Sequence, residues 1–141
     1  MECFIVNDIK LLKMNIEGNK TVINKSKSEV IAFLTKMENF EQLMPENTKF
    51  EVLSEDVFLF GLKGMPEIKL RLKDQTENSV ILGAASDKLP FTLTANLNEI
   101  ESSKTESQLS FTGEFNAMMG MMIKGPITKF VGQLSENLSK I

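Results

Sequence analysis

The sequence contains no histidine, tyrosine or tryptophan and only one cysteine among its 141 residues. Histidine is the side chain whose ordinary pKa lies nearest to neutral pH, so its absence removes the most versatile general acid or base. It also excludes any Ser-His or Cys-His pair for nucleophilic catalysis. The single cysteine, Cys3, cannot form an internal disulfide, which favours a reducing compartment and predicts a cytoplasmic protein.

A strong excess of charge of either sign is also lacking. Sixteen lysine and arginine residues stand against nineteen aspartate and glutamate residues, for a net charge of -3, and the two signs are interspersed. This pattern provides no basic footprint for nucleic acid. No apolar run approaches the roughly 20 residues of a membrane span, and the short apolar patch near the start has no basic leader. We therefore expect no nucleic-acid partner, no integral membrane segment and no secretory signal.

Length and composition indicate one domain. A chain of 141 residues that is 42% apolar is large enough for a substantial hydrophobic core. The first convincing strand pattern begins just after Met14, so we expect residues 1–13 to be an N-terminal extension of uncertain order. Residues 14–141 are then expected to form a single domain.

Two short helices are predicted directly after the first strand, which we place at residues 15–24. Ser26 and Glu29 have the spacing of a capping box, which predicts a helix over residues 27–36. Asn39 and Gln42 repeat that spacing and predict a second short helix over residues 40–44, which Pro45 ends.

From residue 48 onward the apolar period changes from helical spacing to two, which indicates strands. Residues 57–62, VFLFGL, form a nearly continuous apolar run that is typical of a strand buried on both faces. Later segments alternate apolar with polar residues, and the turns between them are polar or rich in glycine. The apolar alternating positions are Ile68, Leu70, Leu72, Val80, Leu82, Phe91, Leu93, Ala95, Leu97, Leu109, Phe111 and Phe115.

The last segment, residues 116–141, predicts a long amphipathic helix that covers the apolar face of these strands. Its second half has apolar residues at spacings of three and four, namely Ile127, Phe130, Val131, Leu134, Leu138 and Ile141. The predicted fold class is α+β: a curved antiparallel sheet of about seven strands around a C-terminal helix.

These segments resemble the START-related, helix-grip (SRPBCC) superfamily, nearest to its small bacterial polyketide-cyclase-like proteins. The residues that carry the resemblance are the capped helix pair, INKSKSEVIAFLTKMENFEQLMP, and the C-terminal stretch KGPITKFVGQLSENLSKI. The resemblance implies a cavity between the sheet and the long helix, with the helix pair near its mouth. The superfamily includes lipid carriers, metabolite binders, cyclases and regulatory domains, so the resemblance does not decide the function.

The start of the long helix is unusual for its methionines, Met118, Met119, Met121 and Met122. Methionine is flexible and polarizable, which suits an adaptable cavity wall, but it is equally suited to filling an ordinary core. Thioethers also bind Cu(I), yet no cysteine or histidine is near them and no metal-ligand spacing occurs. We therefore expect no metal and no cofactor.

Gly125 and Pro126 interrupt the helical pattern. Proline lacks an amide hydrogen and clashes with the carbonyl four residues earlier, so it kinks or breaks a helix or opens a new one. The interruption either lets the helix follow a curved sheet or leaves a gap that admits a ligand.

The sequence favours binding of a hydrophobic or amphipathic small molecule, lipid or polyketide-like, over catalysis. The expected cavity wall is Met118, Met119, Met122, Phe91, Leu93, Phe111 and Phe115. No catalytic residue is assigned, because the ionisable residues of the strands alternate toward the outer face.

Two other functions stay open at this stage. A cyclase or dehydratase would need a carboxylate inside the cavity. A ligand-free interaction domain would expose an apolar patch around Phe40, Leu43 and Met44. A homodimer through the methionines is also left open.

Overall fold

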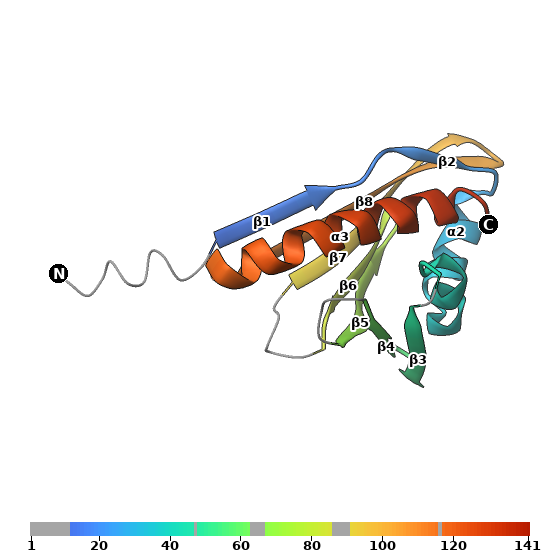
Figure 1. Cartoon of the computed structure of the whole chain (residues 1–141). Coiled ribbons are helices and arrows are strands. Elements are labelled where there is room, and N and C mark those ends of the chain that lie inside the picture. Colours follow the sequence, from blue (N-terminus) through green and yellow to red (C-terminus); the bar gives the residue numbers. More distant parts are fainter. Residues whose placement is uncertain (1–11, 47, 63–66, 86–90, 116) are drawn as a thin grey trace.

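The computed structural model describes residues 12–46, 48–62, 67–85, 91–115 and 117–141. One antiparallel sheet curves around a long C-terminal helix, as Figure 1 shows. The predicted α+β helix-grip class is therefore confirmed. The strands are β1 (Leu12–Glu17), β2 (Thr21–Ile23), β3 (Lys49–Ser54), β4 (Val57–Gly61), β5 (Ile68–Thr76), β6 (Ser79–Ala84), β7 (Phe91–Glu101) and β8 (Lys104–Phe115).

The strands follow the order β1-β8-β7-β6-β5-β4-β3, and β2 also pairs with β8. From β3 to β8 each strand pairs with its neighbour in the sequence, which keeps the connections short. The first and last strands in the sequence, β1 and β8, are neighbours in the sheet.

The single strand expected over residues 15–24 is in fact two strands, β1 and β2, separated by residues 18–20. Gly18 lies at the break, and its amide donates a hydrogen bond to the Leu109 carbonyl at 2.8 Å. A Cβ atom added to Gly18 would lie 2.7 Å from Ser135 Oγ and 3.0 Å from Val131 Cγ1. Only glycine permits this close approach of the long helix to the strand.

The start of β1 bears on the expected N-terminal extension. Leu12 pairs with Phe115, and Lys13 pairs with Glu114, so these two residues lie within the sheet. Residues 1–11 are outside the described part of the chain. The division of the chain at residue 14 stays a prediction.

The helix pair differs in type from the prediction. Helix α2 (Lys27–Leu34) begins at the expected capping box: Ser26 Oγ accepts from the Glu29 amide, and Glu29 accepts from the Ser26 amide. The second element, η1 (Met37–Leu43), is a 3-10 helix that begins after Lys36 and has no side-chain cap. Asn39 does not cap it, because the Asn39 amide group donates instead to the Phe33 carbonyl at the end of α2.

Helix α3 (Ala117–Leu138) runs through Pro126 as one helix, so the proline neither ends it nor opens a second one. It packs mainly on β8, β1, β2 and η1, and Figure 1 shows it lying along β1, β8 and β7. Its sheet-facing residues are Gly120, Ile123, Ile127, Phe130, Val131, Leu134, Ser135 and Leu138. The core therefore lies between α3, the helix pair and the concave face of the sheet.

Candidate functional site

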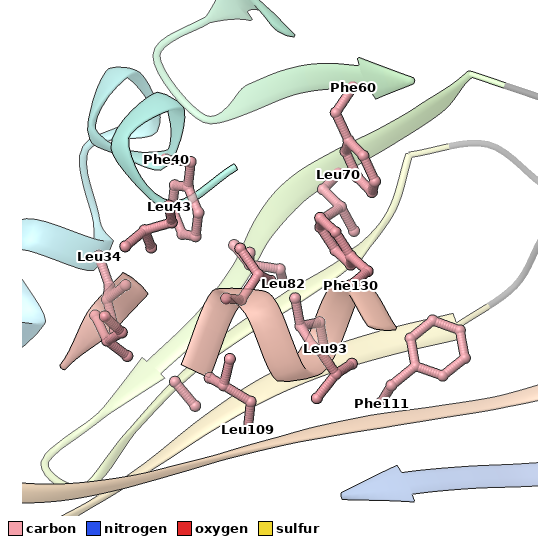
Figure 2. Packing of buried hydrophobic residues seen from close by; sticks show 14 of the residues in the cluster. Leu34, Phe40, Leu43, Phe60, Leu70, Leu82, Leu93, Leu109, Phe111 and Phe130 are labelled. Carbon is pink, nitrogen blue, oxygen red and sulfur yellow. The ribbon is translucent and has the colours of Figure 1, made fainter. Parts of the chain in front are cut away.

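The space between the sheet and α3 is almost completely filled at the end nearest the helix pair. An internal pocket of about 20 Å³ remains there, which is room for about one water molecule. Every residue that lines it is apolar: Leu34, Phe40, Leu43, Val80, Leu82, Leu93, Ala95, Leu109, Leu134 and Leu138. Figure 2 shows six of these side chains converging from α2, η1 and the strands: Leu34, Phe40, Leu43, Leu82, Leu93 and Leu109.

The four expected wall residues on the strands are all buried in the core, but only one of them lines this pocket. That residue is Leu93. Phe91 and Phe111 are in contact at 4.8 Å between ring centroids, and Phe115 stacks on Phe111 at 6.1 Å. Gly113 makes room for these rings, because a Cβ there would lie 2.8 Å from both Phe91 and Phe115. The small residue on the sheet face accommodates large neighbours.

The methionines of α3 take different positions. Met119 is half-buried against the core cluster. Met118 and Met122 are 81% and 49% exposed, and Met121 is 81% exposed. The expected wall residues Met118 and Met122 are therefore directed largely to solvent, because the helix turns Gly120 and Ile123 toward the sheet instead.

A larger hollow opens beside Pro126. It is an open groove of about 730 Å³ between the middle of α3, the end of β4 and the segment that joins η1 to β3. Phe130, Leu62 and Pro126 give it an apolar floor, whereas polar groups form its rim. The rim residues are Glu46, Thr48, Lys129 and Gln133, and Pro45 and Gly125 complete the lining.

Aromatic rings separate this groove from the core. Phe130 stacks on Phe60 with 4.6 Å between ring centroids and 9° between ring planes, and Figure 2 shows the two rings side by side. Phe60 contacts Phe58 at 6.0 Å, and Phe58 stacks on Phe40, which lines the internal pocket. Phe130 lines the groove, and Leu134, one turn further along α3, lines the pocket.

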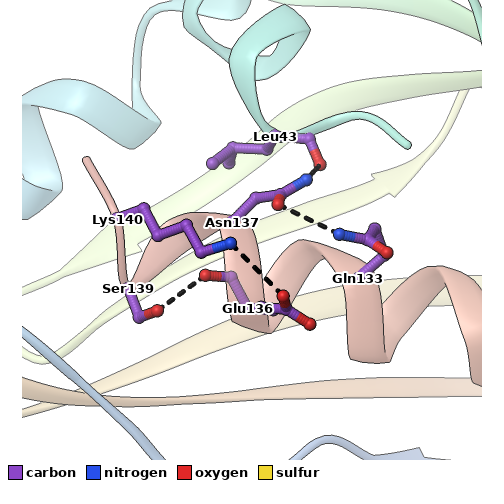
Figure 3. A network of polar contacts seen from close by, with 6 residues as sticks. All are labelled: Leu43, Gln133, Glu136, Asn137, Ser139 and Lys140. Carbon is purple, nitrogen blue, oxygen red and sulfur yellow. Dashed lines mark hydrogen bonds and ion pairs between the residues drawn. The ribbon is translucent and has the colours of Figure 1, made fainter. Parts of the chain in front are cut away.

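A polar network fastens η1 to α3 (Figure 3), and one of its members, Gln133, also lies at the rim of the groove. Asn137 Nδ2 donates to the Leu43 carbonyl at 2.9 Å, and Gln133 Nε2 donates to Asn137 Oδ1 at 3.0 Å. The Asn137 bond gives a hydrogen-bond donor to the Leu43 carbonyl at the end of the 3-10 helix. The network therefore fixes Leu43 and Leu138, two walls of the pocket, relative to each other.

Among the described residues, the two ionisable groups with clearly shifted pKa values, Glu29 and Lys49, line neither space. Hydrogen bonds with the Ser26 backbone amide and hydroxyl lower the pKa of Glu29. The hydrogen bond and charge of Glu67 raise the pKa of Lys49. Neither residue lines the pocket or the groove, so neither shift prepares a group for catalysis there.

No cluster of three metal-ligating side chains of the His, Cys, Asp or Glu type occurs within the described ranges. In that same part of the chain, no helix combines the length and the apolar character that crossing a bilayer requires.

No protein-family model matches the sequence, and no curated protein matches it significantly. Solved structures do match in fold. Norcoclaurine synthase from Thalictrum flavum, in complex with dopamine and hydroxybenzaldehyde, has a TM-score of 0.69 at 12% identity, covering 96% of this chain and 90% of that one. The KanY protein has a TM-score of 0.74 at 14% identity, covering 92% and 97%.

A START superfamily protein from Mycobacterium smegmatis also matches, with a TM-score of 0.64 at 13% identity over 93% of this chain and 95% of that one. The fold is therefore START-like, as the sequence resemblance implied. Structural matches at such low sequence identity define the fold and do not identify a ligand.

A gap that admits a ligand was one of the two interpretations of Gly125 and Pro126, and both residues line the groove. Sequence reasoning missed the other groove residues and the stacked pair Phe60 and Phe130. The pairing of Phe60 with Phe130 joins residues 70 positions apart, and no local pattern reports such a contact.

Proposed function

We propose that the chain binds a hydrophobic or amphipathic small molecule, lipid or polyketide-like, between the sheet and α3. The observation that carries this proposal is the closeness of the open groove to the apolar pocket at one point of α3: Phe130 lines the groove, and Leu134, one turn further along, lines the pocket. In the proposed mode, the apolar part of the ligand passes Pro126 and displaces Phe130. Its polar end stays at the rim, near Lys129 and Gln133.

The expected free energies of binding support a pocket that widens when the ligand enters. A ligand tail that buries about 200 Å² of apolar surface gains about 5 kcal/mol at roughly 25 cal/mol per Å². Separating one stacked aromatic pair, such as Phe60 and Phe130, costs about 0.5–1.5 kcal/mol beyond the area term. Association and side-chain ordering oppose binding further. The balance favours ligands with a long apolar part over small polar metabolites.

In this proposal the deeper wall of the ligand site is formed by Phe91, Leu93, Phe111, Phe115 and Met119. These residues are buried or half-buried in the core cluster. Met118 and Met122 would join the wall only if the first turns of α3 rotated, since their side chains are exposed.

The rival functions have less support. All ten residues lining the internal pocket are apolar, and the carboxylate of the groove lining, Glu46, is exposed at the rim. Neither space therefore holds the buried carboxylate that a cyclase or dehydratase would need. Phe40, Leu43 and Met44, the patch expected of an interaction domain, are buried in the core.

The test uses the purified chain, native mass spectrometry and titration with palmitate. Gly125→Trp places a large side chain at the groove, where a Cβ atom would have nothing within 4 Å. Gly132→Trp is the matched control: it is on the same helix and equally unobstructed, but it does not line the groove. We expect Gly125→Trp to weaken palmitate binding at least tenfold and the control to bind like the original chain.

Equal binding by the two folded variants would exclude the groove as the entrance. No palmitate adduct with the original chain, together with no co-purifying compound in an organic extract, would refute the binding function for this ligand class.

A further inference from the structure

The first turns of α3 expose a patch of large apolar side chains that the ligand site does not use. Met118, Met121 and Met122, which we call the methionine face, are 81%, 81% and 49% exposed. Single exposed apolar residues are common, but three of them on adjoining turns of one helix form a contiguous patch. No acidic residue occurs between Ala117 and Gln133, so this stretch of helix surface carries only lysines as charged groups.

The next turns of the same exposed surface carry glycines. Gly125 and Gly132 are exposed, and nothing lies within 4 Å of a Cβ built at either position. Because α-helices have 3.6 residues per turn, Met118, Gly125 and Gly132 follow one another at two-turn intervals along one line. The exposed side of α3 thus has large methionines on its first turns and small residues at Gly125 and Gly132, with Thr128 and Lys129 between them.

This arrangement complements itself about Gly125. Met118 lies seven residues before Gly125, and Gly132 lies seven residues after it. In an antiparallel pair of α3 helices with the two-fold axis at Gly125, each Met118 would face Gly132 of the other copy. Met121 would face Lys129 in the same way, and the aliphatic part of a lysine side chain packs well on an apolar neighbour.

We propose that α3 forms an antiparallel homodimer contact, in which the methionine face of each copy fills the shallow surface over Gly125 and Gly132 of the other. A two-fold interface must be self-complementary, and this surface meets that condition. An unrelated partner would not require bulky and shallow positions to be symmetric about one residue. The proposal does not rest on the ligand-binding function, although the contact would cover Gly125 and Lys129, which also line the groove.

Charge permits this contact. Two Lys129 side chains, each four residues from the axis, would start about 12 Å apart along the helices. That separation exceeds the screening length of about 8 Å at physiological salt, so their repulsion is small.

The area sets the expected strength. The stretch from Met118 to Gly132 is about 21 Å long and a helix is about 10 Å wide, so the contact is much smaller than the about 800 Å² per partner of a standard interface. We therefore expect a weak dimer that forms with rising concentration, with a dissociation constant of micromolar order or above.

Sedimentation equilibrium of the whole chain over a wide concentration range tests the proposal. We expect a reversible monomer–dimer equilibrium and at least a tenfold weaker association for Gly132→Trp. Lys69→Trp, at an exposed position on β5, is the control and should associate normally. Gly132→Met alone should weaken the association, because it places two large side chains opposite each other. Adding Met118→Ala should restore the association, because the large and the small residue then exchange places in the contact.

Cross-linking tests the register. In a Cys3→Ser background, Gly125→Cys lies on the proposed axis and should form a covalent dimer on mild oxidation. Met121→Cys should not, because its two copies would start about 12 Å apart along the helices and a disulfide needs Cα atoms within about 7 Å.

Three outcomes would overturn the proposal. The first is a chain that stays monomeric at all concentrations. If Met118 in that monomer also resists oxidation by peroxide, the same chain covers the methionine face. The second is a dimer that Gly132→Trp does not weaken. The third is cross-linking through Met121→Cys in preference to Gly125→Cys.

Discussion

The two halves of α3 face the same sheet, but they differ in how many residues they bury against it. From Ile127 to Leu138 the helix buries six residues against β2, β8 and η1, and the Asn137 bond to Leu43 adds a polar attachment. From Ala117 to Met122 it buries only Gly120 and leaves three methionines in solvent. The comparison indicates that the second half stabilises the fold, whereas the first half is free to serve binding or association.

Pro126 lies at the boundary between the two halves. It removes the amide that would donate to the Met122 carbonyl, so the backbone ladder is weakest where the helix changes character. The groove lies at this same boundary. Each prediction below tests whether this division into a stabilising half and a binding half is correct.

The largest expected effect comes from shortening a buried side chain in the second half. Leu134→Ala should reduce the free energy of unfolding by about 2–5 kcal/mol, because Leu134 is fully packed and already borders the internal pocket. Met121→Ala in the first half should change it by less than about 0.5 kcal/mol. Urea denaturation at low protein concentration measures both, and similar losses would contradict the division of α3.

Pro126→Ala should act in the opposite direction and increase the free energy of unfolding by about 1–3 kcal/mol. The change restores a helix amide and removes the clash with the Met122 carbonyl. Gly132→Ala is the reference, expected to gain about 0.5–1 kcal/mol from helix propensity alone. A Pro126→Ala gain no larger than that reference would mean that the proline already sits in the helix without strain.

Local signals were enough to predict most elements of the fold. The Ser26–Glu29 capping box, the period-two strands and the apolar spacing from Ile127 to Leu138 each identified an element that the structure contains. Errors arose where a distant contact prevailed. Asn39 has the spacing of a cap, but its amide group bonds to Phe33, and Gly18 divides the first strand because α3 approaches it closely.

The candidate site was less accessible to sequence reasoning. The strand phases correctly placed Phe91, Leu93, Phe111 and Phe115 on the concave face, but they could not show that Gly113 lets those rings fill the space. Met118 and Met122 were assigned by composition, whereas the rotation of α3 is fixed by Ile123 and Ile127, which are more strongly buried. Cavity volume depends on such packing, which a one-dimensional pattern does not specify.

A smaller effect should come from the polar attachment of the second half. Asn137→Ala should reduce the free energy of unfolding by about 1–2 kcal/mol, because it leaves the Leu43 carbonyl without its donor. Amide hydrogen exchange should show the loss of protection centred on η1. Gln133→Ala, which removes only the bond to Asn137, is the milder control, and equal loss in the two variants would place the attachment elsewhere.

The smallest effect should come from the capping box of α2, which is remote from the first half of α3 and depends on pH. The pKa of Glu29 is lowered in the folded chain by its bonds with Ser26, so its contribution is complete above its ordinary pKa of 4.5. That contribution is lost as the pH falls through the lower, folded-state value. Glu29→Gln should therefore have a lower melting temperature than the original chain at pH 7, with the difference shrinking as the pH is lowered below 4.5. A difference that stays constant with pH would show that the charge of Glu29 does not contribute. The loss should also be confined to the side of the molecule that holds α2, leaving association through the methionine face unchanged.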